Sequence, residues 1–89
     1  MFEWDENKRH INIEKHGIDF VDAKELWLGE VIEITSPQTS HGEMRILAVG
    51  VINEMCITVV YTWRGSKRRL ISARRARNYE QEHYYDAIG

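Results

Sequence analysis

The sequence has 89 residues, of which 43% are hydrophobic and 29% are charged, and its formal net charge at pH 7 is −2. These values and the nine aromatic residues argue against disorder and predict one soluble globular domain spanning residues 1–89. The single cysteine, Cys56, excludes an internal disulfide and a cysteine-based zinc cluster. No run approaches the roughly 20 apolar residues of a membrane span, and the N-terminus lacks a signal-peptide pattern, so we expect a cytoplasmic protein.

The first predicted elements are a short strand and a helix. Residues 2–4 alternate between apolar and polar side chains, as a short edge strand does. Asp5 is a suitable N-cap for a helix over residues 6–16. Only Ile11 and Ile13 are strongly apolar in this helix, so we expect it to lie on the surface with a thin buried stripe.

A second helix is predicted between Asp19, which can cap its start, and Gly29, which ends it. Four apolar residues recur in it at helical spacing and predict a buried face: Phe20, Ala23, Leu26 and Trp27. Two short helices joined by a tight turn at Gly17 can lie together across a sheet.

After Gly29 the apolar periodicity changes to 2, which predicts four strands, at residues 31–35, 44–51, 55–63 and 68–73. Residues 36–40 include Pro37 and are typical of a loop. The third strand is the most hydrophobic, so we place it at the centre of the sheet. A closing helix is expected from Arg74 to about Ala87, with one stripe formed by Ala76, Tyr79, His83 and Ala87.

This order of elements predicts an α+β fold. Strands joined by short turns pair antiparallel, so we expect a four-stranded antiparallel sheet with a short N-terminal edge strand. The two N-terminal helices and the C-terminal helix would cover one face, leaving the other for a partner or substrate. On the third strand, Ile57, Val59, Tyr61 and Trp63 would face the helices, because this set is larger and more apolar than the alternate one.

Seven of the twelve basic residues lie between residues 61 and 77, with no acid among them: Arg64, Lys67, Arg68, Arg69, Arg74, Arg75 and Arg77. Such a segment suits a polyanion, most commonly the phosphate backbone of a nucleic acid, and the alternative is an acidic face of a partner protein. A solvated turn with charged flanks would also explain its first half. The last three arginines would begin the closing helix, where cations oppose the helix dipole and a bound anion would compensate.

RNA cleavage without a metal requires a proton acceptor, a proton donor and cations around the phosphate. Arginine suits the cationic role because its planar fork binds phosphate oxygens in pairs, and the candidates are Arg45, Arg64, Arg74 and Arg75. Candidates for proton transfer are Glu43, His16, His41 and Lys15. Each has a simpler alternative: a Glu43–Arg45 ion pair, helix termination by Lys15 and His16, and a polar loop around His41. Trp63 beside Arg64 either packs in the core or stacks on a base. No set of residues has the spacing of metal ligands, so we expect neither metal nor cofactor.

Several separate motifs in this chain resemble the BrnT family of bacterial type II toxins. The resemblance rests on Phe2-Glu3-Trp4-Asp5 with Lys8, Asn12, Lys15-His16-Gly17, Phe20 and Ala23, on Gly42-Glu43-x-Arg45, on Val60-Tyr61-Thr62-x-Arg64, and on Arg69-x-Ile71-Ser72-Ala73-Arg74-x-Ala76 with Glu80 and Tyr84. It spans nearly the whole chain.

The resemblance implies a RelE-like fold and a metal-independent endoribonuclease toxin. The implied partner is a BrnA-type antitoxin, a ribbon-helix-helix DNA-binding protein, so operator DNA would be contacted only through the antitoxin. Arg45, Arg64, Arg74, Lys15, His16 and Glu43 match positions that the family shares. The alternative function is an inactive binding module that pairs with an acidic or DNA-binding partner and modulates autorepression. Direct DNA reading by this chain is disfavoured, since no predicted helix has an exposed basic face.

Overall fold

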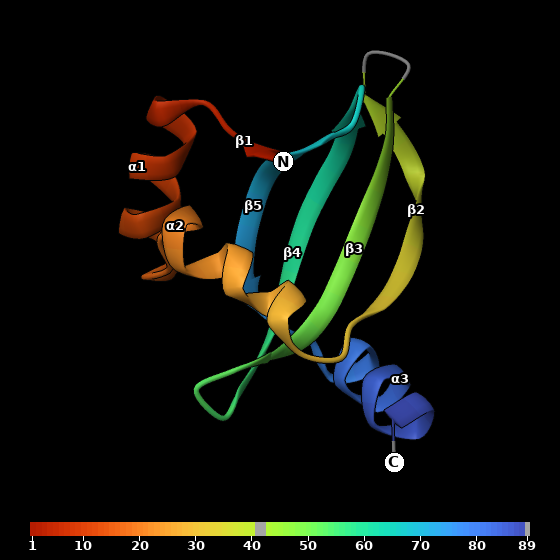
Figure 1. Ribbon diagram of the computed structural model, residues 1–89. Helices are drawn as coiled ribbons and strands as arrows, with labels where there is room; N and C mark the ends of the chain where they lie inside the picture. Colours follow the sequence, from red (N-terminus) through yellow and green to blue (C-terminus); the bar gives the residue numbers. More distant parts are fainter. Residues whose placement is uncertain (41–42, 89) are drawn as a thin grey trace.

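The computed structural model describes residues 1–40 and 43–88, and it describes side chains except those of residues 37–40 (Figure 1). The elements follow in the order β1 (Phe2–Glu3), α1 (Glu6–His16), α2 (Phe20–Ala23), the 3₁₀ helix η1 (Lys24–Leu28), β2 (Ile32–Ser40), β3 (Glu43–Ile52), β4 (Met55–Arg64), β5 (Lys67–Arg75) and α3 (Asn78–Ile88). The described helices include none that is long and apolar enough to cross a membrane. His41, a candidate for proton transfer, lies outside the described residues.

One sheet of five strands organises the chain, in the order β1-β5-β4-β3-β2, which confirms the predicted α+β class and the central position of β4. Strands β2 to β5 pair antiparallel, as expected from their short connections. The two-residue strand β1 instead pairs parallel to β5, with Phe2 opposite Arg68. The prediction of an antiparallel sheet is therefore only partly right, because the intervening helices allow β1 to join the sheet in the parallel direction.

Helix α1 has the predicted bounds but buries a different residue. The Asp5 carboxylate accepts hydrogen bonds at its start, and Gly17 ends it in the left-handed conformation with φ of 71°. The expected stripe of Ile11 and Ile13 is wrong, since both side chains are exposed and Asn12 is buried instead. The Asn12 amide donates to the carbonyl of Ala73 and accepts from its N–H, at 2.9 and 3.1 Å. Helix α1 thus takes the place of a strand along the edge of β5 beyond β1.

The second predicted helix is a single α-helical turn, α2, continued by the 3₁₀ helix η1. The Asp19 carboxylate accepts from the N–H of Val21 at its start. Its apolar residues pack against the face of β4 that carries Ile57, Val59 and Tyr61, as the alternation along this strand predicts. In Figure 1, α2 and η1 cross the front of the sheet. We call this side the helical face and the opposite side the outer face.

Strand β2 is longer than the sequence pattern indicates. Residues 36–40, predicted as a loop, belong to the strand, which continues past Pro37 to Ser40. Its register to β3 shifts between Thr35 and Thr39. Because β2 is an edge strand, a residue without an N–H can be accommodated where no neighbour needs that donor.

The C-terminal prediction is wrong in two respects. Arg74 and Arg75 end β5, paired with Thr58 and Ile57, and α3 begins only at Asn78. In addition, α3 lies across the outer face at one end of the sheet, so helices cover parts of both faces. Its buried residues are Glu80 and Tyr84, whereas Tyr79 of the predicted stripe is exposed. Pairing with the central strand has overridden the helical tendency of the arginine-rich segment.

Candidate nucleic-acid interface

A register shift in β5 decides which basic residues reach the outer face. Ser72 lies opposite Val60, but Leu70 lies opposite Tyr61, so Ile71 is an additional residue in the strand. On β4, Thr58, Val60 and Thr62 alternate with the residues of the helical face, so their side chains point to the outer face. Residues that lie opposite one another on paired strands share a face. Three residues of β5 therefore project outward together: Arg69, Ser72 and Arg74. Strict alternation along β5 would put Arg69 on the opposite face from Ser72 and Arg74, and the bulge brings all three to the same face.

Two adjoining hollows lie between α1 and the outer face. The first, of about 160 Å³, is lined by Asp5, Lys8, Glu43, Arg45, Thr62, Arg64, Arg69 and Ile71. The second, of about 340 Å³, is lined by Lys8, Ile11, Asn12, Lys15, His16, Arg45, Ile71 and Ser72. They share Lys8, Arg45 and Ile71, and we call the two together the cationic groove. Five predicted site residues line it, namely Arg45, Arg64, Glu43, Lys15 and His16, as does Arg69 of the predicted phosphate-binding set.

Acidic residues orient two of the groove arginines. Arg64 donates to Glu43 through Nε at 2.7 Å and Nη2 at 3.3 Å, and this hydrogen bonding raises the pKa of Arg64. Arg69 donates through Nη1 to Glu3 of β1 at 3.0 Å. Half of the Arg64 side chain remains exposed despite its ion pair. Both guanidinium groups are thus oriented at the rim of the groove. Glu43 thus forms these bonds with Arg64 of β4, whereas the sequence suggested Arg45 as its partner.

The other end of the groove carries the residues suited to proton transfer. Lys15 and His16 occupy the last turn of α1, and both line the second hollow. Partial burial lowers the pKa of His16, and the positive charges of Lys15 and Arg74 lower it further. His16 is therefore a neutral imidazole at pH 7, able to accept a proton.

Arg74 occupies a different environment from the groove arginines. Its guanidinium donates two hydrogen bonds to Glu80 of α3, at 2.8 and 2.9 Å, and only 14% of the side chain is exposed. Burial alone raises the pKa of Glu80, but hydrogen bonds from Arg74, the N–H of Arg77 and Thr58 outweigh it and lower the pKa to about 2. Arg74 also lies far from Arg64, although only ten residues separate them in the sequence. Arg74 pairs with Thr58, which is six residues before Arg64 on β4, so the two arginines are about 20 Å apart along the strand.

The remaining basic residues of segment 61–77 are dispersed. Lys67 is exposed at the turn after β4, and Arg77 is exposed immediately before α3. Arg68 points to the helical face among aromatic rings, and Arg75 lies beside Met55 at the far end of β5. The continuous charge of the sequence is therefore divided between both faces and both ends of the sheet.

Sequence reasoning did not select Lys8, although it lines both hollows. The signal was its spacing of seven residues from Lys15, which places both side chains on one face of a helix. With Asn12 between them anchored to β5, this face of α1 is directed toward the sheet.

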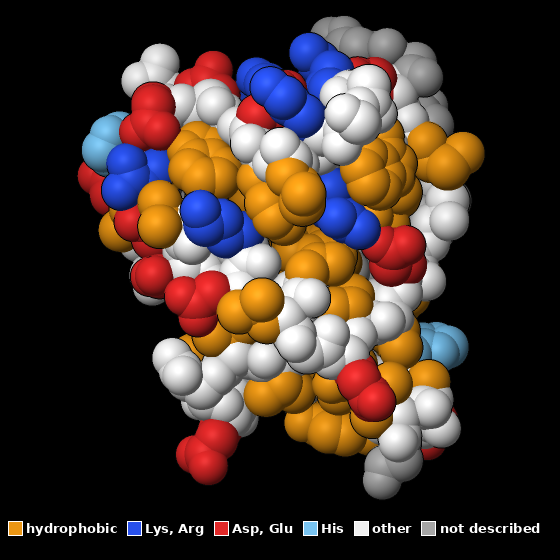
Figure 2. Space-filling model, viewed as in Figure 1, with side chains coloured by type: hydrophobic (Ala, Val, Ile, Leu, Met, Phe, Trp, Pro, Cys, Tyr) orange, Lys and Arg blue, Asp and Glu red, His pale blue; other side chains and the backbone are white. Residues whose placement is uncertain are grey.

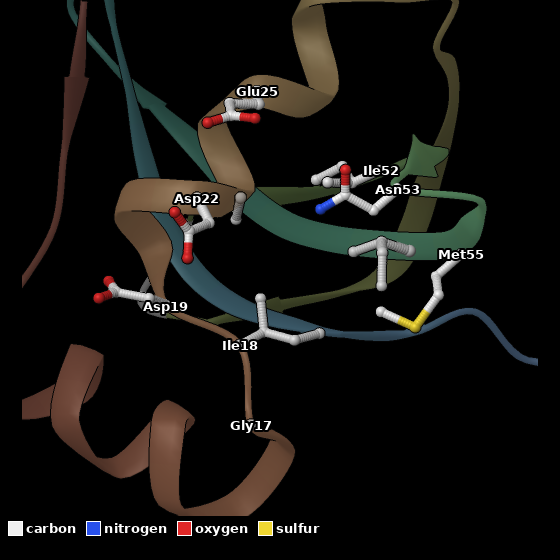
Figure 3. Close-up of a pocket in the computed structure, with 10 residues that line it drawn as sticks. Gly17, Ile18, Asp19, Asp22, Glu25, Ile52, Asn53 and Met55 are labelled. Atoms are coloured by element: carbon white, nitrogen blue, oxygen red, sulfur yellow. The ribbon is translucent and has the colours of Figure 1, made fainter.

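A separate hollow, of about 340 Å³, has the opposite electrostatic character. Figure 3 shows Asp19, Asp22 and Glu25 on one side of it and, on the other, Ile52 at the end of β3, Asn53 in the turn and Met55 at the start of β4. Carboxylates repel phosphate, so this hollow does not suit RNA. Among residues 1–40 and 43–88, no three His, Cys, Asp or Glu side chains group together as metal ligands would.

Residues 4–80 match the family described as the ribonuclease toxin BrnT of type II toxin–antitoxin systems. The chain belongs to this family. The matched range contains every residue that lines the cationic groove, from Asp5 to Ser72, and extends to Glu80 in the first turn of α3. No curated protein matches the chain. Because the family consists of ribonuclease toxins of type II toxin–antitoxin systems, the chain's membership points to RNA cleavage as the activity and to an antitoxin as the partner.

Proposed function

We propose that the chain cleaves single-stranded RNA in the cationic groove by a mechanism that needs no metal ion. The observation that carries this proposal is the concentration of Lys8, Lys15, Arg45, Arg64 and Arg69 on one side of a protein whose net charge is −2. These residues come from α1, β3, β4 and β5, and only the fold brings them together. A groove of this charge attracts a phosphate backbone and repels cationic ligands.

Arg45 is the best placed residue to bind the phosphate at which cleavage occurs. It lines both hollows and thus lies between the Arg64 end of the groove and the His16 end. Its guanidinium would bind the non-bridging oxygens, whose negative charge increases when the 2′-oxygen attacks phosphorus. Arg64, oriented by Glu43, would neutralise the adjoining phosphate.

Two residues in the last turn of α1, His16 and Lys15, would carry out the proton transfers. The neutral imidazole of His16 would take the proton of the attacking 2′-hydroxyl, since its lowered pKa leaves it unprotonated at pH 7. The ammonium of Lys15, in the same hollow, would donate a proton to the departing 5′-oxygen. The products would be a 2′,3′-cyclic phosphate and a 5′-hydroxyl. Arg74 would serve structurally by anchoring α3, and Arg75 and Arg77 would lie outside the groove.

The test is a cleavage assay with purified protein in EDTA. Arg45→Ala should lower kcat/KM about 10²- to 10³-fold, as removal of a group that stabilises a charged transition state does. Arg75→Ala, an exposed arginine outside the groove, is the matched control and should cut at the wild-type rate. Equal cleavage by Arg45→Ala and wild type would remove this site assignment. If the wild-type chain binds its antitoxin but cuts no RNA, the binding-module alternative replaces the proposal.

The finer identity of the partner is also a proposal, supported by the family. We infer that the partner is a BrnA-type antitoxin with a ribbon-helix-helix domain, and that the complex contacts operator DNA only through this antitoxin. We also infer that the toxin has a RelE-like fold and acts in the cytoplasm. Co-expression with the adjacent gene should restore growth that the toxin alone arrests. Electrophoretic shift of operator DNA by the complex, and none by the toxin alone, is the second expected result.

A further inference from the structure

A fourth hollow lies where β3 and β4 separate. Within the described residues, the paired register of these strands extends from Ile52 and Met55 to Ile46 and Tyr61, short of the strand ends at Glu43 and Arg64. Beyond that point the Thr62 hydroxyl donates to the carbonyl of Met44 at 2.9 Å. The hollow, of about 340 Å³, is lined by Glu43, Met44, Ile46, Thr62 and Trp63.

The indole of Trp63 forms an aromatic wall of this hollow and is 45% exposed. Its ring packs edge-on against Tyr61, with centroids 5.7 Å apart. The guanidinium of Arg68 lies 4.7 Å from its centroid and 4.8 Å from that of Trp27. The Nε atom of Arg68 is buried without a hydrogen-bond partner among the described residues, so the rings provide its environment. The Trp63 ring is therefore held in place while much of its surface stays open.

Figure 2 shows the types of side chain that cover the helical face. Hydrophobic side chains gather over the middle of the sheet, with Lys and Arg side chains set among them. Aromatic rings interleaved with arginine are typical of surfaces that bind single-stranded nucleic acid, because bases stack on the rings and phosphates pair with the cations.

The hollow adjoins the cationic groove at the end of β4. It shares Glu43 and Thr62 with the first hollow of the groove, which Arg64 also lines. Trp63 is the residue between Thr62 and Arg64, so strand alternation directs its ring to the helical face and the Arg64 guanidinium to the outer face. An RNA strand that passes over the end of β4 with a phosphate at Arg64 would therefore bring its adjacent base to Trp63.

We propose that this hollow is a nucleobase subsite, in which an unpaired base next to the bound phosphate stacks on Trp63; the inference rests on the proposed ribonuclease function. The face of an indole ring stacks on any base, so the subsite recognises the presence of an unpaired base and not its identity.

The test uses fluorescence anisotropy with short 2′-O-methyl oligonucleotides, which the enzyme cannot cut because the attacking hydroxyl is blocked. Wild type should bind a base-bearing strand about 5- to 100-fold more tightly than an abasic strand of the same length, the range for loss of one stacked base. Trp63→Leu should remove this difference, whereas Trp63→Phe should retain most of it. Leu28→Ala, at another exposed apolar residue, is the control and should leave it intact.

Two results would overturn the subsite and separate it from the function on which it rests. If wild type binds and cuts RNA but does not distinguish base-bearing from abasic strands, the subsite is wrong and the ribonuclease proposal stands. If Trp63→Leu weakens binding of the antitoxin and leaves RNA binding unchanged, the hollow is a protein contact instead. A wild-type chain that neither binds nor cuts RNA would remove the proposed function and the subsite with it.

Discussion

Replacing Glu80 with glutamine should destabilise the fold far more than any surface change of charge. The Glu80 side chain is fully buried and accepts four hydrogen bonds, two from Arg74 and one each from Thr58 and the N–H of Arg77. Glutamine has the same shape, but its NH₂ group would face the donors of the guanidinium. The charge of Arg74, 14% exposed, would then be left without its counterion.

The expected loss in the free energy of unfolding follows from the burial of the Glu80–Arg74 ion pair. Removing one partner of a buried ion pair costs about 3–5 kcal/mol. The remaining carbonyl of glutamine can still accept from Thr58 or Arg77, which favours the lower end, about 3 kcal/mol. A domain of this size has a free energy of unfolding of about 5–10 kcal/mol, so the variant should lose a third or more of its stability.

Urea unfolding followed by tryptophan fluorescence measures the effect. With an m value of about 1–2 kcal/mol/M, the midpoint of Glu80→Gln should fall by about 2 M while m stays constant. Glu82→Gln, an exposed acid on the same helix, is the matched control and should change stability by less than about 0.5 kcal/mol. A Glu80→Gln midpoint equal to that of the control would refute the assignment of this cluster as the anchor of α3.

The same cluster predicts a dependence on pH. The folded-state pKa of Glu80 is about 2, below its ordinary value of 4.5, so its stabilising contribution is present above pH 4.5 and is lost as the pH falls toward 2. Protonated Glu80 is neutral, as glutamine is. The difference in unfolding midpoint between wild type and Glu80→Gln should therefore shrink by more than half between pH 7 and pH 3. A constant difference across this range would contradict the lowered pKa.

Two further predictions concern packing and catalysis. Gly50→Ala should destabilise the protein by about 1–3 kcal/mol in thermal unfolding. A Cβ at Gly50 would lie 2.8 Å from Cδ1 of Leu26, which is fully buried, and 3.2 Å from the carbonyl oxygen of Glu30. Gly65→Ser is the control, because Gly65 has a φ of 60° at an open turn position and tests backbone strain without that clash. If His16 is the proton acceptor, the acid limb of the kcat/KM profile should fall below pH 6.5, because its pKa is lowered, and His16→Gln should abolish that limb; a limb above pH 7 would count against this role.

Local sequence rules located most of the elements correctly because they depend on near neighbours. The bounds of α1 follow from the Asp5 cap and from Gly17, and the inward face of β4 follows from alternation. The same rules failed where a distant partner decided the outcome. Asn12 is buried because its amide pairs with the edge of β5, 61 residues away, and Arg74 belongs to a strand because it pairs with Thr58.

The candidate site shows the same division. Composition and spacing identified Arg45, Arg64, Glu43, Lys15 and His16 as chemically suitable, and all five line the groove. The sequence alone determined the α+β class, the family motifs and the presence of a strongly basic segment, because these properties reside in residue identity and short-range periodicity. Only the tertiary structure decided that this segment is divided, since one additional residue in β5 sets which arginines share a face. Register is a property of two strands together, and no single stretch of sequence contains it.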